Sequence, residues 1–111
     1  MSMERSNELI KKGNAVISKF LGYSFVPDFN LEWSELIPAV KKIQSHGCIV
    51  EIMFVLGTIC RIQKPSQTPA LISCTENNSS IVAVWDAVLE YITWESLQPQ
   101  MNNKTFWNNK S

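Results

Sequence analysis

Apolar residues recur every three or four positions between residues 79 and 94, and this is the clearest helical pattern in the chain. At about 100° per residue they gather into one broad stripe, the face that a helix turns toward a protein core. A side-chain oxygen of Ser79 or Ser80 can accept from the first-turn amides and cap the helix. The stripe consists of Ile81, Val84, Trp85, Val88, Leu89, Tyr91 and Ile92.

Ala83, Ala87 and Trp94 lie outside this stripe, on the side of the helix that is expected to face solvent. A tryptophan above a strip of small residues can form a docking surface, so these three residues are interface candidates. The alternative is that the following chain folds over Trp94, since one aromatic is not a patch. Phe106 and Trp107 are further interface candidates, because aromatic residues often anchor contacts.

A first helix is predicted from Ser6, which can cap it, to about Leu21, after which Gly22 ends it. Gly13 lies in the middle of its apolar side. Because Gly costs about 1 kcal/mol relative to Ala in a helix interior, we expect a close crossing with another element at this position. That apolar side consists of Leu9, Ile10, Gly13, Val16, Ile17 and Phe20.

A second helix is predicted over about residues 31–46, and Gly47 closes it. Pro38 leaves its start open. A start at Ser34 puts Pro38 in the first turn, where a missing amide costs little, whereas a start at Asn30 predicts a kink. The apolar face consists of Trp33, Leu36, Ile37, Val40 and Ile43.

Alternation and β-branched residues predict strands at residues 48–54, 58–64 and 70–76. A three-residue loop joins the first two strands, with Gly57 expected in the left-handed conformation, which is a common hairpin type. The alternation places Val50, Ile52 and Phe54 on one face of the first strand, together with Cys48.

The loop length sets the register of this hairpin. With three loop residues, Ile52 faces Cys60 and Glu51 faces Arg61, whereas a two-residue loop would place Ile52 opposite Arg61. The face around Glu51 and Arg61 is mixed rather than plainly solvated, and we expect a helix or a partner subunit to cover it.

The predicted order of elements is helix, helix, three strands, helix. This order implies an α+β domain in which a three-stranded antiparallel meander packs with three amphipathic helices. A chain of 111 residues has room for one core, so residues 1–97 are predicted to form a single domain. Residues 98–111 are rich in Asn and are expected to form a flexible tail.

Ten basic residues balance ten acidic ones, so a basic face for duplex nucleic acid is not expected. The three cysteines lie inside apolar runs and are interpreted as reduced core residues. Neither a secretory signal nor an apolar run of about 20 residues is present, which predicts a soluble, intracellular protein without a membrane segment.

Catalytic and metal-binding patterns are not evident in the sequence. His46 has no cysteine or carboxylate at ligand spacing and is interpreted as a solvated residue at a helix end. The four glycines form no phosphate-binding loop, so no cofactor is predicted. Glu51 and Arg61 are interpreted first as an ordinary cross-strand ion pair and second as a polar site.

Several segments together resemble the phage ABA sandwich domain, which occurs in small proteins of bacteriophages and prophages. They are residues 33–43, the strand segments 50–52 and 60–62, and residues 81–94 with the closing tryptophan. The resemblance covers about residues 8–96, while the loop after the second strand and the long tail depart from it. The family has no established catalytic residues, so the resemblance implies a fold and a phage or prophage accessory protein.

We therefore expect a non-catalytic protein that binds a host factor in the bacterial cytoplasm, and that forms a homo-oligomer. The preferred hypothesis is an anti-defence protein that sequesters a small nucleotide-like signal or inhibits a host protein. In the first case Arg61 and Lys64 would reach phosphates and Trp33 or Trp94 would stack on a base. Glu51 is a further candidate residue of this ligand site.

Two alternatives remain open. The first is a structural or assembly protein that self-associates through Trp94 and the tail. The second, less favoured, is a small hydrolase in which Glu51 or Asp86 acts as a base, which would require a pocket that perturbs the pKa of that carboxylate.

Overall fold

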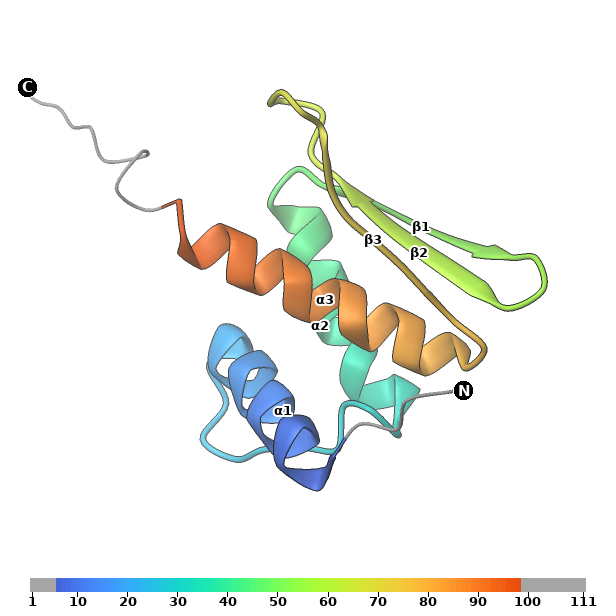
Figure 1. The fold of residues 1–111 in the computed structure, drawn as a ribbon. Coiled ribbons are helices and arrows are strands. Elements are labelled where there is room, and N and C mark those ends of the chain that lie inside the picture. The colour runs from blue at the N-terminus through green and yellow to red at the C-terminus, as the bar shows by residue number, and fades with distance from the viewer. Residues whose placement is uncertain (1–5, 99–111) are drawn as a thin grey trace, which may run out of the picture.

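The computed structural model describes residues 6–98 and has the predicted element order of two helices, three strands and a helix (Figure 1). The sheet is antiparallel with strand order β1-β2-β3, so the predicted α+β meander is confirmed. Apart from Gln98, the predicted tail lies outside the described residues. The elements are α1 (Asn7–Leu21), α2 (Trp33–Ser45), β1 (Ile49–Phe54), β2 (Thr58–Gln63), β3 (Leu71–Asn77) and α3 (Ser80–Ser96).

The β1–β2 hairpin has the predicted register, with Glu51 facing Arg61. The predicted left-handed conformation of Gly57 is wrong, because its φ does not lie in that region. Space is tight there instead: a Cβ at Gly57 would lie 3.0 Å from the carbonyl oxygen of Asn77, closer than an ordinary van der Waals contact. The hairpin end therefore packs tightly against the end of β3.

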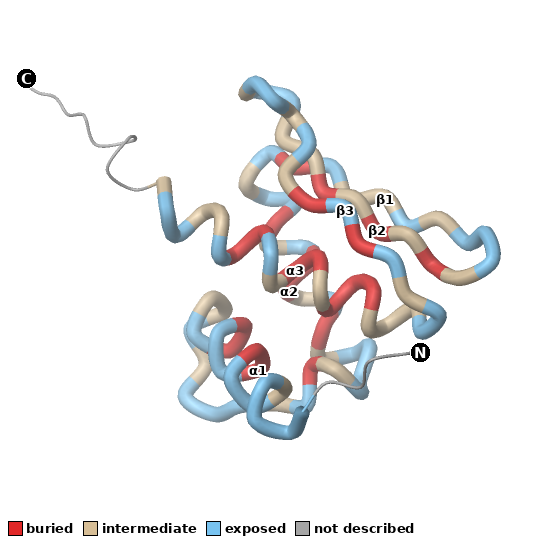
Figure 2. The backbone as a smooth tube through the Cα atoms, viewed as in Figure 1, coloured by how far each residue is buried: buried red, intermediate tan, exposed pale blue. Residues whose placement is uncertain are grey.

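All three helices lie on one side of the sheet, and α3 is the layer next to the strands (Figure 1). Helix α3 contacts β2 and β3 on one side and α1 and α2 on the other, so buried residues run along much of its length (Figure 2). Ser79 caps it, as predicted, by accepting from the amide of Val82. The strongest helical pattern of the sequence is thus the centre of the core.

The predicted solvent side of α3 is wrong at Ala83 and Ala87, which are both completely buried. This side faces the sheet, since the Thr75 hydroxyl donates to the carbonyl of Ala83 across 2.6 Å and the Ser73 hydroxyl donates to Glu90 across 2.8 Å. Small side chains allow the helix to approach the strands closely. Because α3 is covered by the sheet on one side and by helices on the other, Ala83 and Ala87 belong to the core and cannot contact a partner.

Helix α1 has the predicted caps and the predicted close crossing. Ser6 accepts from the amide of Leu9, and Gly22 ends the helix with a φ of 78°. A Cβ at Gly13 would lie 2.5 Å from Cζ2 of Trp85, which no real structure tolerates without movement. Gly13 therefore allows α1 to pack directly on the indole ring of α3.

The predicted apolar side of α1 is only partly buried. Leu9 and Val16 are exposed, whereas the polar residues Asn14 and Ser18 are buried. Buried polar groups are stable when they are hydrogen-bonded, and Asn14 Oδ1 accepts from Nε1 of Trp85 across 2.9 Å. Ser18 donates to a loop carbonyl. These bonds rotate the helix away from the orientation that hydrophobicity alone predicts.

Helix α2 begins at Trp33, between the two starts considered from the sequence, and Glu32 is its N-cap residue. Pro38 therefore falls inside the helix, in its second turn, and has no amide to donate to the preceding turn. Gly47 follows the helix with a φ of 87°, as expected for a closing glycine.

Candidate binding surfaces

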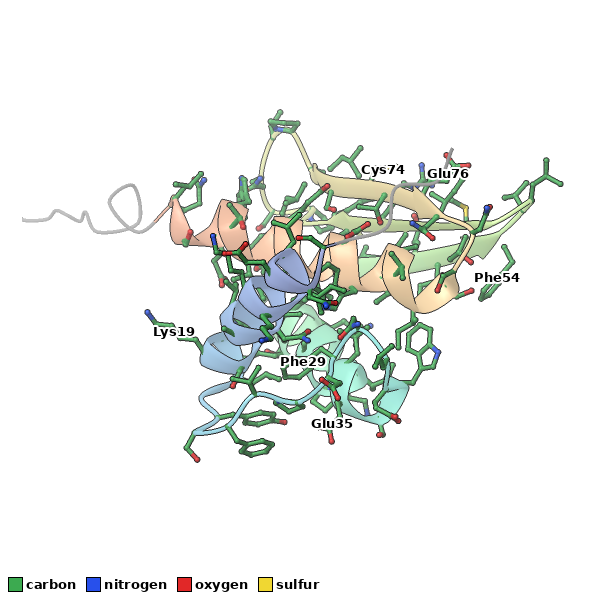
Figure 3. The ribbon with its side chains drawn as sticks, turned by 60° about the horizontal axis from the view of Figure 1, so that its bottom comes forward. Lys19, Phe29, Glu35, Phe54, Cys74 and Glu76 are labelled. Carbon is green, nitrogen blue, oxygen red and sulfur yellow. The ribbon has the colours of Figure 1, made fainter. Side chains whose placement is uncertain are left out.

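One face of the sheet lies against α3, and among residues 6–98 no helix covers the opposite face (Figure 1). In β2 the alternate residues Thr58, Cys60 and Ile62 are buried, so the residues between them point away from the helices. Cys74 and Glu76 of β3 project from the same side (Figure 3). We call this side the outer sheet face, and it consists of Ile49, Glu51, Met53, Ile59, Arg61, Gln63, Cys74 and Glu76.

The predicted Glu51–Arg61 pair is present at the middle of the outer sheet face. Nη2 of Arg61 lies 3.2 Å from Oε1 of Glu51, and Nε2 of Gln63 donates to the same oxygen across 3.1 Å. The Arg61 and Glu51 side chains are 38% and 42% exposed, so the pair contributes at most about 1 kcal/mol to stability. Its chemical effect is to neutralise the arginine, because a phosphate would have to compete with the bound carboxylate.

The four predicted ligand residues do not form one site. Arg61 and Glu51 lie on the outer sheet face, but Nζ of Lys64 lies 6.0 Å from the ring centroid of Trp94, which belongs to α3. Trp33 is the first residue of α2, also on the helix side of the sheet. Strand alternation separates Arg61 from Lys64, since residues an odd number apart point to opposite faces.

The predicted interface on α3 is wrong for its two alanines, and its tryptophan is only partly exposed. Ala83 and Ala87 are buried against the sheet, and Trp94 is half-buried, with its ring 5.8 Å from that of Tyr91. Phe106 and Trp107 lie outside the described residues.

A polar cluster that the sequence interpretation missed joins the ends of α2 and α3. Nδ1 of His46 lies 2.7 Å from Oε2 of Glu95, and the Tyr91 hydroxyl donates to the same oxygen across 3.0 Å. His46 lies at the end of α2, as predicted, but its imidazole is 29% exposed and bonded to Glu95, so it is not the freely solvated side chain that the sequence suggests. Tyr91 and Glu95 are four residues apart on one helix face, which is the sequence signal for their pairing, but His46 comes from 49 residues away.

This cluster has the properties of a structural tie. Burial raises the pKa of Tyr91 well above its ordinary value, and burial likewise raises the pKa of the Cys48 thiol, which also bonds to Tyr91. Both groups are thus neutral at neutral pH, whereas a nucleophile or general base needs a lowered or intermediate pKa. The cluster holds the last turn of α3 to the end of α2.

The cysteines differ in exposure. Burial raises the pKa of Cys60 to about 11, which makes its thiol unreactive at neutral pH. Cys74 is exposed on the outer sheet face, so the prediction that all three cysteines are core residues is wrong for it. Within residues 6–98 no group of three or more histidine, cysteine or acidic side chains is arranged to hold a metal ion.

A hollow of about 480 Å³ lies between α1 and the end of α3. Its wall is mostly apolar, and its charged groups are Lys19, which points outward at the end of α1 (Figure 3), and Glu95, which already bonds to His46 and Tyr91. The charges that could orient a ligand in this hollow are therefore at its rim or are already paired.

The end of the β1–β2 hairpin is an exposed apolar segment. Phe54 is 73% exposed, Val55 is 70% exposed and Leu56 is 99% exposed. In Figure 3 Phe54 projects from the far end of β1 on the helix side of the sheet. Contiguous exposed apolar residues of this kind mark interaction sites more often than scattered ones do.

Comparison of the chain with models of protein families, with curated proteins and with solved structures finds no match. The resemblance to the phage ABA sandwich domain therefore stays a prediction from the sequence. None of the helices within the described part of the chain has both the length and the apolar character that a membrane span requires.

Proposed function

We propose that the protein is a non-catalytic binding protein that recognises another protein through its outer sheet face. The observation that carries this proposal is the composition of that face: apolar side chains, of which Ile49 is 49% exposed, surround the polar group of Glu51, Arg61 and Gln63. Protein interfaces combine apolar contact area with polar groups that hydrogen-bond to the partner, and Nε of Arg61 is a buried donor without a hydrogen-bond partner among the described residues. No helix of residues 6–98 covers this face.

A protein partner fits this face better than a nucleotide does. Phosphate recognition favours several cationic groups that converge, and Lys64 lies on the other side of the sheet from Arg61. Arg61 is also engaged by Glu51. Of the two activities expected for a phage-type accessory protein, inhibition of a bacterial host protein is therefore the one that we propose.

The outer sheet face can be altered without breaking the hairpin. Met53 and Ile59 face each other across β1 and β2, so Met53→Lys combined with Ile59→Glu removes apolar surface but places opposite charges side by side. The control replaces two exposed apolar residues in the loop before α2, Val26→Lys with Leu31→Glu. Thermal unfolding of both variants checks that they fold.

The tagged full-length protein is then used to capture partners from a bacterial lysate, with quantitative mass spectrometry of what is retained. We expect at least one host protein to be enriched by the wild-type and control chains and lost by the Met53→Lys/Ile59→Glu chain. Partners that the sheet variant retains as well as the wild type does would contradict the proposal. So would the absence of any partner common to the wild type and the control.

A further inference from the structure

The two edges of the sheet are protected to different extents. The edge strand β3 has a register irregularity opposite Ile62 and Gln63 and carries Ser, Thr and Glu, features that discourage pairing with another strand. The other edge strand, β1, has the sequence IVEIMF and pairs regularly with β2 along its whole length. It contains no proline, glycine, lysine or bulge, and its one charged residue, Glu51, is paired with Arg61 of β2, so its free edge has little of the usual protection.

The side of β1 that faces the helices, which we call its inner side, is covered at the N-terminal end of the strand but not at the C-terminal end. Val50 packs against the core, whereas Ile52 is 36% exposed and Phe54 is 73% exposed. Both of these exposed residues face the same way as their strand partners Cys60 and Thr58, which are buried. The second half of β1 therefore extends past the helical layer, with apolar side chains on its inner side.

We propose that two copies of this chain associate by antiparallel pairing of their β1 strands, with Ile52 at the two-fold axis. Directly opposite residues in such a pair share a face, so their numbers must sum to an even value. A centre at Glu51 would place two carboxylates opposite each other, which is unfavourable. A centre at Ile52 instead places Glu51 opposite Met53 of the partner subunit and keeps the whole second half of the strand paired.

This register is the reason why we propose a second copy of the chain, and not an unrelated strand, as the partner of β1. With Ile52 at the axis, Phe54 lies opposite Val50 of the partner subunit. The exposed end of each β1 is thus placed against the helix-covered end of the other, so one symmetric contact buries apolar side chains that a single copy exposes. The free backbone groups of both edges are paired at the same time.

The paired strands join the two sheets into one continuous sheet, and the two outer sheet faces become neighbours. This inference rests on the edge and inner side of β1, not on the outer sheet face, so it stands or falls independently of the proposed function. Met53→Lys, the substitution used there, would lie opposite Glu51 of the partner subunit and is compatible with the dimer.

The test is analytical ultracentrifugation of the full-length protein over a wide range of concentration. We expect a species of twice the 12.6 kDa chain mass. Ile52→Lys brings two ammonium groups together at the axis and should weaken dimerisation by about 100-fold or more. Phe54→Lys is the second variant, since its exposed side chain contributes little to the fold of one copy, and Leu31→Lys, at an exposed loop residue, is the control.

The register is tested by cross-linking in a chain with Cys74→Ser, which removes the exposed thiol. Ile52→Cys should give a disulfide-linked dimer on mild oxidation, and Glu51→Cys should not. The proposal is overturned by a monomer at every concentration, by a dimer that both lysine variants leave intact, or by cross-linking through Glu51→Cys instead of Ile52→Cys.

Discussion

Replacement of Gly13 by alanine tests how closely α1 and α3 pack. The new methyl group would lie 2.5 Å from Cζ2 of Trp85 and 2.8 Å from Cδ1 of Leu89, whereas carbon atoms normally approach to about 3.5–4.0 Å. Leu89 is partly exposed and can rotate. Trp85 cannot move as easily, because it is 3% exposed and its Nε1 donates to Asn14.

Two opposing free-energy terms decide the outcome. Forcing extra carbon into a packed core costs about 1–3 kcal/mol, and alanine is favoured over glycine in a helix by about 1 kcal/mol. Because Trp85 is buried and its Nε1 is bonded to Asn14, we expect the steric cost to lie in the upper part of its range, about 2–3 kcal/mol. After the helix-propensity gain is subtracted, Gly13→Ala should reduce the free energy of unfolding by about 1–2 kcal/mol. For a domain of this size, each kcal/mol lowers Tm by about 4–8 °C.

Urea unfolding followed by circular dichroism at a helix wavelength measures this change. Ala15→Gly is the matched control, since Ala15 is exposed on the same helix and reports the helix-propensity term alone. In a Trp85→Phe background, whose shorter ring lacks the clashing atoms, Gly13→Ala should become neutral or stabilising, and the double-mutant cycle isolates this coupling. Gly13→Ala that stabilises the wild-type chain by as much as Ala15→Gly destabilises it would refute the close packing.

Two further predictions concern the cysteines. Cys74 is exposed while Cys48 and Cys60 are buried, so one thiol per chain should react rapidly with a maleimide in the native protein, and Cys74→Ser should abolish this rapid phase. Stability should fall in alkali. The folded-state pKa of Cys60 is raised from 9.0 to about 11, so the unfolded chain loses this proton first and binds fewer protons than the folded one. The contribution of the protonated Cys60 thiol to the free energy of unfolding is complete below pH 9. It is lost as the pH rises toward 11, which lowers the free energy of unfolding by about 2–3 kcal/mol in all. Urea midpoints measured between pH 8 and 11 should therefore fall less steeply for Cys60→Ala, and equal slopes would contradict the assignment.

Local patterns predicted the secondary structure well, for physical reasons that can be stated. Helix α3 follows from its apolar period and its serine cap. The hairpin register follows from a parity rule, because a three-residue loop leaves Glu51 opposite Arg61. Gly13 was expected at a close crossing because glycine is costly in a helix. Each of these inferences depends only on residues near one another in the sequence.

The candidate site was less predictable because it depends on contacts between distant residues. The tie between His46 and Glu95 spans 49 residues, and the burial of Asn14 depends on the indole Nε1–H of Trp85, 71 residues away. Neither contact leaves a periodic signal. Periodicity detects large apolar residues and therefore predicts a solvent-facing side at Ala83 and Ala87. These alanines are buried because α3 packs on both sides, and a face made of small residues gives no signal of this.

The remaining mismatch between pattern and structure is informative about partners. The exposure of Leu9 and Val16 on α1 has a cause inside the chain. The helix is oriented so that polar residues with hydrogen-bond partners, such as Asn14, are buried instead. A strand has no such freedom: once β1 pairs with β2, the face on which Ile52 and Phe54 lie is fixed. Their alternation is that of core residues, yet they are exposed. An apolar face that the fold cannot turn inward is the place where association should be sought first.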